Sequence, residues 1–112
     1  MQGNHDQRLI FITSMGIYNE IPESVGSEGN LDNFPTLETY RKAADLIENS
    51  GLNYTIIRPG WFINGPVDYE LTQKGEPFGG HDVSISSIAD LVVNIIEKPA
   101  YCLNQSVGIN KK

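Results

Sequence analysis

The apolar positions of this chain fall into short continuous runs separated by amphipathic stretches. The run at residues 8–13 is unbroken over a strand's length, which is typical of a strand buried on both faces, as in parallel sheets. A second run, at 54–57, ends at a Pro-Gly pair and predicts a buried strand that leads into a loop. Residues 106–109 fit a last short strand, and residues 83–85 fit a further one.

Between the first two predicted strands, residues 36–49 carry apolar side chains at helical spacing, which predicts an amphipathic helix. Thr36 or Thr39 is expected to cap this helix, and Gly51 to stop it. The side chains expected on its buried stripe are Leu37, Tyr40, Ala43, Ala44 and Ile47. Those expected to face outward are Glu38, Arg41, Lys42, Asp45 and Glu48.

A second helix is predicted from Ser87, because Ser87 and Asp90 have the Ser-x-x-acid spacing of a capping box. On this interpretation Asp90 is a helix cap rather than an acid catalyst. The helix is expected to end at Lys98 and Pro99. Its apolar stripe consists of Ile88, Leu91, Val92, Ile95 and Ile96.

The predicted order is strand-helix-strand-helix-strand, which indicates an α/β fold with a parallel sheet and flanking helices. Residues 18–35 and 67–80 are expected to be a long loop and a turn-rich segment. A chain of 112 residues is one small domain at most, so we expect a single domain over residues 1–112. Three strands and two helices leave much of such a sheet bare, so we expect the chain to be completed by further polypeptide or by another copy.

Composition narrows the classes of function. A net charge of −6 argues against nucleic acid, which needs a basic surface. One cysteine, Cys102, allows no intramolecular disulfide, and a reduced, cytoplasmic setting fits. No apolar run approaches the roughly 18 residues that span a bilayer, so no membrane association is expected. His5 and His81 lie too far apart to suggest a metal site, and we expect none.

The candidate site lies where the predicted strands end. The run at 54–57 leads into Arg58-Pro59-Gly60 and then Trp61, while Ser14 follows the first strand. In open α/β sheets, ligands bind at the loops that leave the carboxyl ends of the strands. Arg58 could bind a phosphate, or equally pair with a nearby Asp or Glu.

Three pieces, residues 10–18, 52–60 and 87–91, resemble in sequence and order the atypical short-chain dehydrogenases/reductases, in particular the NmrA-like NAD(P)-binding proteins. The resemblance covers residues 8–109 and implies the C-terminal half of a Rossmann-like domain with NAD or NADP as cofactor. Ser14 matches the serine that orients substrate in that family. The cofactor-binding residues implied by the resemblance are Thr13, Ser14, Pro59, Gly60 and Trp61.

The chain also departs from the family pattern. No glycine-rich loop opens a helix, so nothing in the sequence offers a site for a pyrophosphate, and we expect weak dinucleotide binding or none. The family's Tyr-x-x-x-Lys pair is absent, because Ala44 stands four residues after Tyr40. Tyr18, after the first strand, is the candidate substitute acid, although packing in its loop is the favoured explanation.

Two functions remain in view. The first is an NAD(P)-binding oxidoreductase, or a protein like a nucleoside-diphosphate-sugar epimerase, acting on a small molecule. The alternative is a non-catalytic NmrA-like dinucleotide sensor or regulator, or a structural fragment that needs a partner chain. The expected partners are a small-molecule substrate and either an N-terminal half or another copy of the chain.

Overall fold

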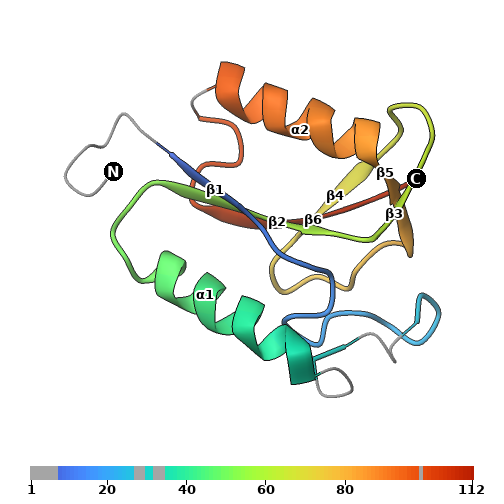
Figure 1. Ribbon diagram of the computed structural model, residues 1–112, viewed down its shortest axis with the longest axis horizontal. Coiled ribbons are helices and arrows are strands. Elements are labelled where there is room, and N and C mark those ends of the chain that lie inside the picture. Colours follow the sequence, from blue (N-terminus) through green and yellow to red (C-terminus); the bar gives the residue numbers. More distant parts are fainter. Residues whose placement is uncertain (1–7, 27–29, 32–34, 99) are drawn as a thin grey trace.

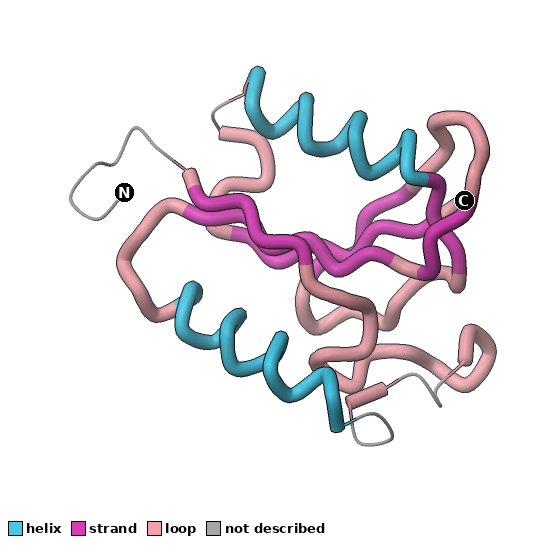
Figure 2. Tube along the Cα trace, in the orientation of Figure 1, coloured by secondary structure: helices cyan, strands magenta, loops and turns pink. Residues whose placement is uncertain are grey.

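A computed structural model describes residues 8–26, 30–31, 35–98 and 100–112, and it has one helix on each face of a central sheet (Figure 1). Figure 2 shows the same arrangement, with long loops beside the sheet on the α1 side. No helix among the described residues is long and apolar enough to cross a membrane. The helices are α1 (Glu38–Glu48), preceded by one 3₁₀ turn (Pro35–Leu37), and α2 (Ile85–Glu97).

The main sheet has four strands in the order β1-β2-β6-β4. Its strands are β1 (Leu9–Ile12), β2 (Tyr54–Pro59), β6 (Gln105–Asn110) and β4 (Glu70–Gln73). β1, β2 and β6 are mutually parallel, and β4 pairs antiparallel with β6. The predicted α/β fold with a parallel, Rossmann-like sheet and flanking helices is therefore confirmed.

The two faces of β2 hold two apolar cores, because successive strand residues point to opposite faces. Ile57 packs with β6 and with α2, through Val107, Leu91 and Ile95 among others. Ile56 points to the opposite face and packs with Ile17 and Ala44 under α1. The two helices are thereby packed against opposite faces of the same strand.

The expectation that β1 is buried on both faces is wrong for this structure. β1 pairs only with β2 among the described strands, so it forms an edge of the sheet. The side chain of Ile12 at its end is 43% exposed. The continuous apolar run predicted the strand correctly, but a run of this kind does not say how many neighbours the strand has.

Helix α1 begins and turns differently from the prediction. Leu37 stands at its N-cap with no side-chain hydrogen bond, so neither threonine caps it. Tyr40, expected in the core, is 42% exposed. Arg41 and Glu48, expected to face outward, instead contact the Tyr18 ring and hydroxyl. Leu37, Ala44 and Ile47 of the predicted stripe do pack in the core, so the apolar pattern predicted the inward face but not these polar contacts.

Helix α2 begins two residues earlier than predicted, because Ser84 is its cap. The Ser84 hydroxyl accepts a hydrogen bond from the Ser87 amide at 3.0 Å, and Ser87 lies inside the helix. Asp90 is not a cap, since its carboxylate accepts hydrogen bonds from the Tyr69 hydroxyl and the Asn94 amide. The predicted strand at 83–85 is β5 (Asp82–Ser84).

Two short strands were not predicted. β3 (Trp61–Ile63) follows the Pro-Gly break and pairs with β5 in a separate parallel sheet. β4 lies in the segment predicted to be turn-rich, and its sequence, Glu-Leu-Thr-Gln, carries little apolar pattern. Both strands exist because a distant partner strand satisfies their backbone, which a local pattern does not reveal.

Candidate functional site

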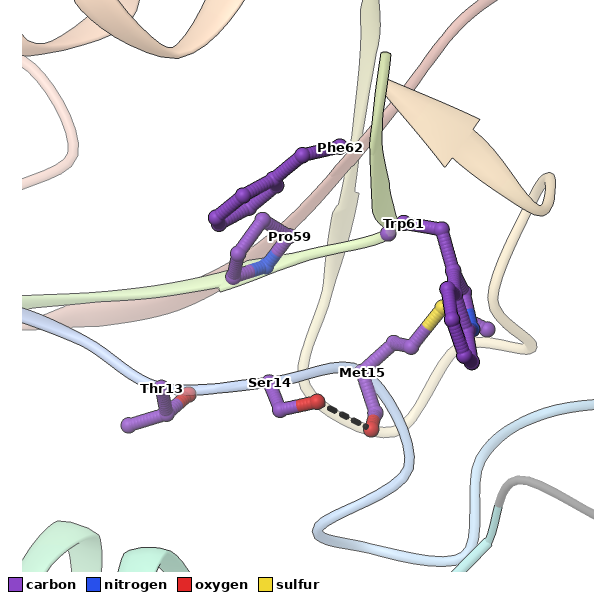
Figure 3. Close-up of a pocket in the computed structure, with 7 residues that line it drawn as sticks. Thr13, Ser14, Met15, Pro59, Trp61 and Phe62 are labelled. Carbon is purple, nitrogen blue, oxygen red and sulfur yellow. Dashed lines mark hydrogen bonds between the residues drawn. The ribbon is translucent and has the colours of Figure 1, made fainter. Parts of the chain in front are cut away.

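A pocket of about 200 Å³ lies at the carboxyl ends of β1 and β2 (Figure 3). Its lining residues are Thr13, Ser14, Met15, Pro59, Gly60, Trp61 and Phe62. All five residues that the resemblance assigns to the cofactor are therefore brought together. Met15 was not predicted, although it directly follows a predicted residue in the sequence.

The wall that contains Ser14 is held against β2 by backbone pairing that continues past the end of β1. The Thr13 amide donates to the Ile57 carbonyl at 2.8 Å, and the Met15 amide donates to the Pro59 carbonyl at 3.0 Å. The Thr13 hydroxyl also donates to Ile57, at 3.1 Å. Ser14 is thus fixed beside the end of β2 by contacts on either side of it.

The opposite wall forms where the chain leaves one sheet for the other. The Gly60 amide donates to the Ile109 carbonyl of β6 at 3.1 Å, and the next amide, that of Trp61, donates to the His81 carbonyl at 2.8 Å. A Cβ at Gly60 would lie 2.5 Å from that same His81 oxygen. Only glycine therefore allows the chain to approach β5 this closely.

The pocket contains few groups that could transfer a proton. None of its lining residues carries a carboxylate, an amine or an imidazole. The Ser14 hydroxyl donates to the Met15 carbonyl at 3.1 Å, so its proton is engaged while its lone pairs can still accept a hydrogen bond. The lining suits binding and orientation better than acid–base catalysis.

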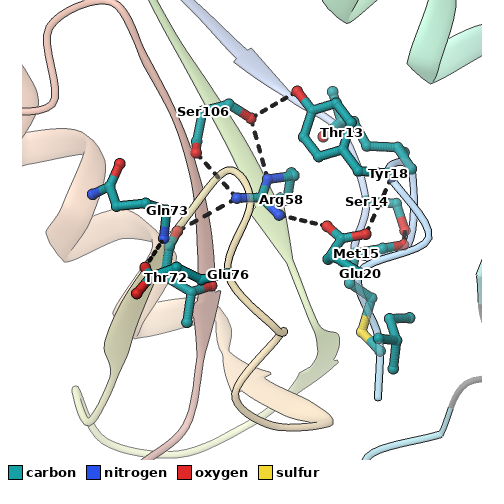
Figure 4. A network of polar contacts seen from close by, with 12 residues as sticks. Thr13, Ser14, Met15, Tyr18, Glu20, Arg58, Thr72, Gln73, Glu76 and Ser106 are labelled. Atoms are coloured by element: carbon teal, nitrogen blue, oxygen red, sulfur yellow. Dashed lines mark hydrogen bonds and ion pairs between the residues drawn. The ribbon is translucent and has the colours of Figure 1, made fainter. Parts of the chain in front are cut away.

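Tyr18, the candidate substitute acid, does not line this pocket. Its hydroxyl donates to a Glu48 carboxylate oxygen at 2.9 Å. The same hydroxyl lies 2.9 Å from the Ser106 hydroxyl (Figure 4). The Tyr18 pKa is raised to about 12, and burial of the phenol is the largest cause of this shift. A phenol held in this way has a packing role in its loop, and a catalytic role for it stays a prediction.

Arg58 is the centre of a buried polar network that the sequence did not reveal (Figure 4). Its side chain is fully buried and forms an ion pair with Glu20, whose side chain is 5% exposed. Its Nε donates to the Ser106 hydroxyl at 3.1 Å, and its Nη2 donates to the Ser106 carbonyl at 3.0 Å and the Thr72 carbonyl at 3.4 Å. Of the two alternatives for Arg58, the structure shows pairing with an acidic residue, which leaves no free guanidinium for a phosphate.

The aromatic ring of Tyr18 lies among three cations. The guanidinium carbons of Arg41 and Arg58 lie 4.9 Å and 5.0 Å from its centroid, and the Lys74 ammonium nitrogen lies 4.7 Å from it. Lys74 also pairs with Glu48 at 2.7 Å. These contacts join α1, the loop after β1 and the segment after β4 into one charged cluster.

The described residues fit one end of a dinucleotide and not the other. The pocket is smaller than the roughly 300–1,000 Å³ of a typical ligand site, so it has room for one ring rather than a whole cofactor. Neither helix offers a phosphate site: α1 carries Glu38 in its first turn, and Ser84 already caps α2. The pocket therefore has room for a single ring, whereas a pyrophosphate has no cradle in the described part of the chain.

No group of three metal-ligating side chains gathers anywhere in the described residues. His5 lies outside that part of the chain. His81 is exposed, with its Nδ1 2.6 Å from an Asp82 carboxylate oxygen.

Replacing Arg58 with methionine should destabilise the chain strongly, because it leaves the Glu20 carboxylate buried without its partner. We expect a loss of about 3–5 kcal/mol in the free energy of unfolding, measured by urea titration. The control is Lys42→Met, which removes an exposed pair with Glu38 and should cost less than about 1 kcal/mol. Equal losses in the two variants would contradict the assignment, as would no recovery when Arg58→Met is combined with Glu20→Leu.

The raised pKa of Tyr18 predicts a loss of stability at high pH. The unfolded chain releases this proton near pH 10.0, whereas the folded chain retains it to about pH 12, so the folded state is progressively disfavoured as pH rises through that window. We expect urea titrations below pH 10.0 and near pH 12 to show a larger drop for the parent than for Tyr18→Phe. Identical drops would show that the Tyr18 phenol ionises at its ordinary pKa.

Comparison with known proteins agrees with this geometry. A short-chain dehydrogenase/reductase from Veillonella parvula, solved in complex with NADP, matches with a TM-score of 0.81 and 28% identity over 94% of this chain and 51% of its own. A Rossmann-fold NAD(P)-binding family protein from Shigella flexneri matches with a TM-score of 0.71 and 40% identity over 94% of this chain and 46% of its own. The chain thus spans about half the length of these two proteins. No curated protein matches it.

The family comparison settles the broader assignment. Residues 1–99 match the model of a family described as NAD(P)H-binding. The resemblance noted in the sequence is thereby confirmed, and with it the expectation of a nicotinamide dinucleotide as the family's cofactor. By this match over most of its length, the chain belongs to the NAD(P)H-binding family of Rossmann-fold proteins.

Proposed function

We propose that the pocket at the ends of β1 and β2 receives the nicotinamide end of NAD or NADP, as one part of an NAD(P)-dependent oxidoreductase. The observation that carries the proposal is that Thr13, Ser14, Pro59, Gly60 and Trp61 line one pocket. This pocket lies at the carboxyl ends of two adjacent parallel strands, where ligands of open α/β sheets bind.

Each wall has a distinct part in this proposal. The segment that contains Ser14 is held rigidly, so its backbone and hydroxyl can orient the carboxamide of the ring. Gly60 presents backbone with no side chain in the way, and Trp61 and Phe62 supply apolar surface to the ring. The cofactor, when bound, supplies the hydride chemistry. The pyrophosphate contacts must come from residues beyond the described ones.

A non-catalytic dinucleotide sensor is the second candidate, and one observation favours it. No lining residue of the pocket carries a titratable acid or base. Epimerisation and carbonyl reduction both usually need a positioned proton donor, so this absence favours binding without turnover over either activity. Binding of NADPH without its consumption in the presence of an acceptor would favour the sensor.

Filling the pocket tests the proposal. Trp61 is the only tryptophan of the chain, so its fluorescence reports directly on the pocket. We expect NADPH to quench that fluorescence. Ser14→Leu, which puts a larger side chain into the pocket, should weaken binding by at least about tenfold, equivalent to about 1.4 kcal/mol.

The matched control is Ser86→Leu, the same substitution at an exposed position on α2. It should leave the NADPH affinity close to that of the parent. If Ser14→Leu bound NADPH as tightly as the parent does, measured by the same fluorescence quenching, a site in this pocket would be contradicted. The site would also be contradicted by a parent chain, shown to be folded by circular dichroism, that does not respond to nicotinamide mononucleotide, which needs no pyrophosphate site.

A further inference from the structure

Trp61 exposes a large flat surface at the mouth of the pocket. Its side chain is 64% exposed, although a tryptophan normally buries most of its area. The His81 ring stacks against it, with centroids 5.7 Å apart and planes inclined by 9°. The imidazole lies nearly parallel to the indole, and most of the indole surface stays exposed beside it.

The shelf formed by Trp61 and His81 is held in place by the backbone. Trp61 pairs with Asp82 in the parallel register of β3 and β5, and its amide donates to the His81 carbonyl. The Asp82 carboxylate lies 2.6 Å from His81 Nδ1, which restrains the imidazole. A rigid, open aromatic face loses little conformational freedom when a ligand stacks on it.

The pocket itself leaves no room for a second ring. Its volume of about 200 Å³ suits one ring, which we have assigned to nicotinamide. Because successive strand residues point to opposite faces, Trp61 and Phe62 flank the entrance from different sides (Figure 3). Any second ligand group must therefore lie at this rim, against one of these two exposed aromatic side chains.

We propose that Trp61, backed by His81, is a stacking subsite for a flat conjugated ring of the substrate, next to the ring in the pocket. Aromatic stacking tolerates many ring systems, because every such ring offers a π-face. The pocket lining carries no charged side chain and the chain has a net charge of −6, so the substrate class is a neutral conjugated ring rather than an anion. The identity of this ring as a substrate rests on the proposed function, whereas the stacking itself does not.

Riboflavin is a suitable probe, since it is neutral, flat and fluorescent, and stacking on an indole quenches it. We expect the parent chain to quench riboflavin, and ribitol, which lacks the ring, not to compete. Trp61→Leu should weaken binding by at least about fivefold. His81→Leu should weaken it as well, and His81→Phe, which keeps a flat ring behind the indole, should restore it.

Tyr40→Leu is the matched control, because it removes another exposed aromatic ring, on α1. Riboflavin affinity in this variant should equal that of the parent. Circular dichroism of each variant establishes that it is folded. Riboflavin binding unaffected by Trp61→Leu, or equally weakened by Tyr40→Leu, would overturn the subsite.

The same variants separate this inference from the proposed function. Riboflavin binding that depends on Trp61 and survives Ser14→Leu supports the subsite, even if NADPH fails to bind. If NADPH binding depends on Ser14 but riboflavin binding does not depend on Trp61, the subsite is wrong and the proposed function is unaffected. If light scattering shows that Trp61→Leu dissociates an oligomer while riboflavin binds as before, the exposed indole is an interface between copies and the proposal is wrong.

Discussion

The buried ion pair between Arg58 and Glu20 is the contact on which the arrangement of this chain depends most. An unpaired charge in an interior costs several kcal/mol, so the guanidinium can remain buried only while its partners stay in place. Those partners come from the loop after β1, from β6 and, at a longer distance, from β4. One side chain on the central strand β2 thereby ties together segments that are distant in sequence.

This constraint positions the candidate site. Arg58 directly precedes Pro59 and Gly60, which line one wall of the pocket. Glu20 lies in the loop after β1, a few residues beyond Ser14, which lines the other wall. The ion pair therefore adds to the backbone hydrogen bonds of Thr13 and Met15 in holding the two walls of the pocket together. The site is an outcome of the polar network on one face of the sheet rather than of the apolar cores alone.

The sequence predicted what local pattern determines and missed what distant partners determine. The strands predicted at 54–57 and 106–109 are present, as β2 (Tyr54–Pro59) and β6 (Gln105–Asn110). The apolar pattern of α1 placed Ala44 and Ile47 in the core correctly, but it could not show that Arg41 contacts Tyr18, a residue outside the helix. The pocket residues were available only through the family resemblance, since spacing alone does not bring Ser14 beside Gly60. His81 had no local signal, because its relation to Trp61 arises from the pairing of β3 with β5.

The most direct test of the central claim is nuclear magnetic resonance of the isotope-labelled chain titrated with nicotinamide mononucleotide. If the pocket binds the nicotinamide ring, the largest shifts should occur at the amides of Ser14, Met15, Gly60 and Trp61, all of which line it. The amide of Gly51, beyond the end of α1, should not move. Shifts concentrated on α1, or spread evenly over the chain, would contradict the account.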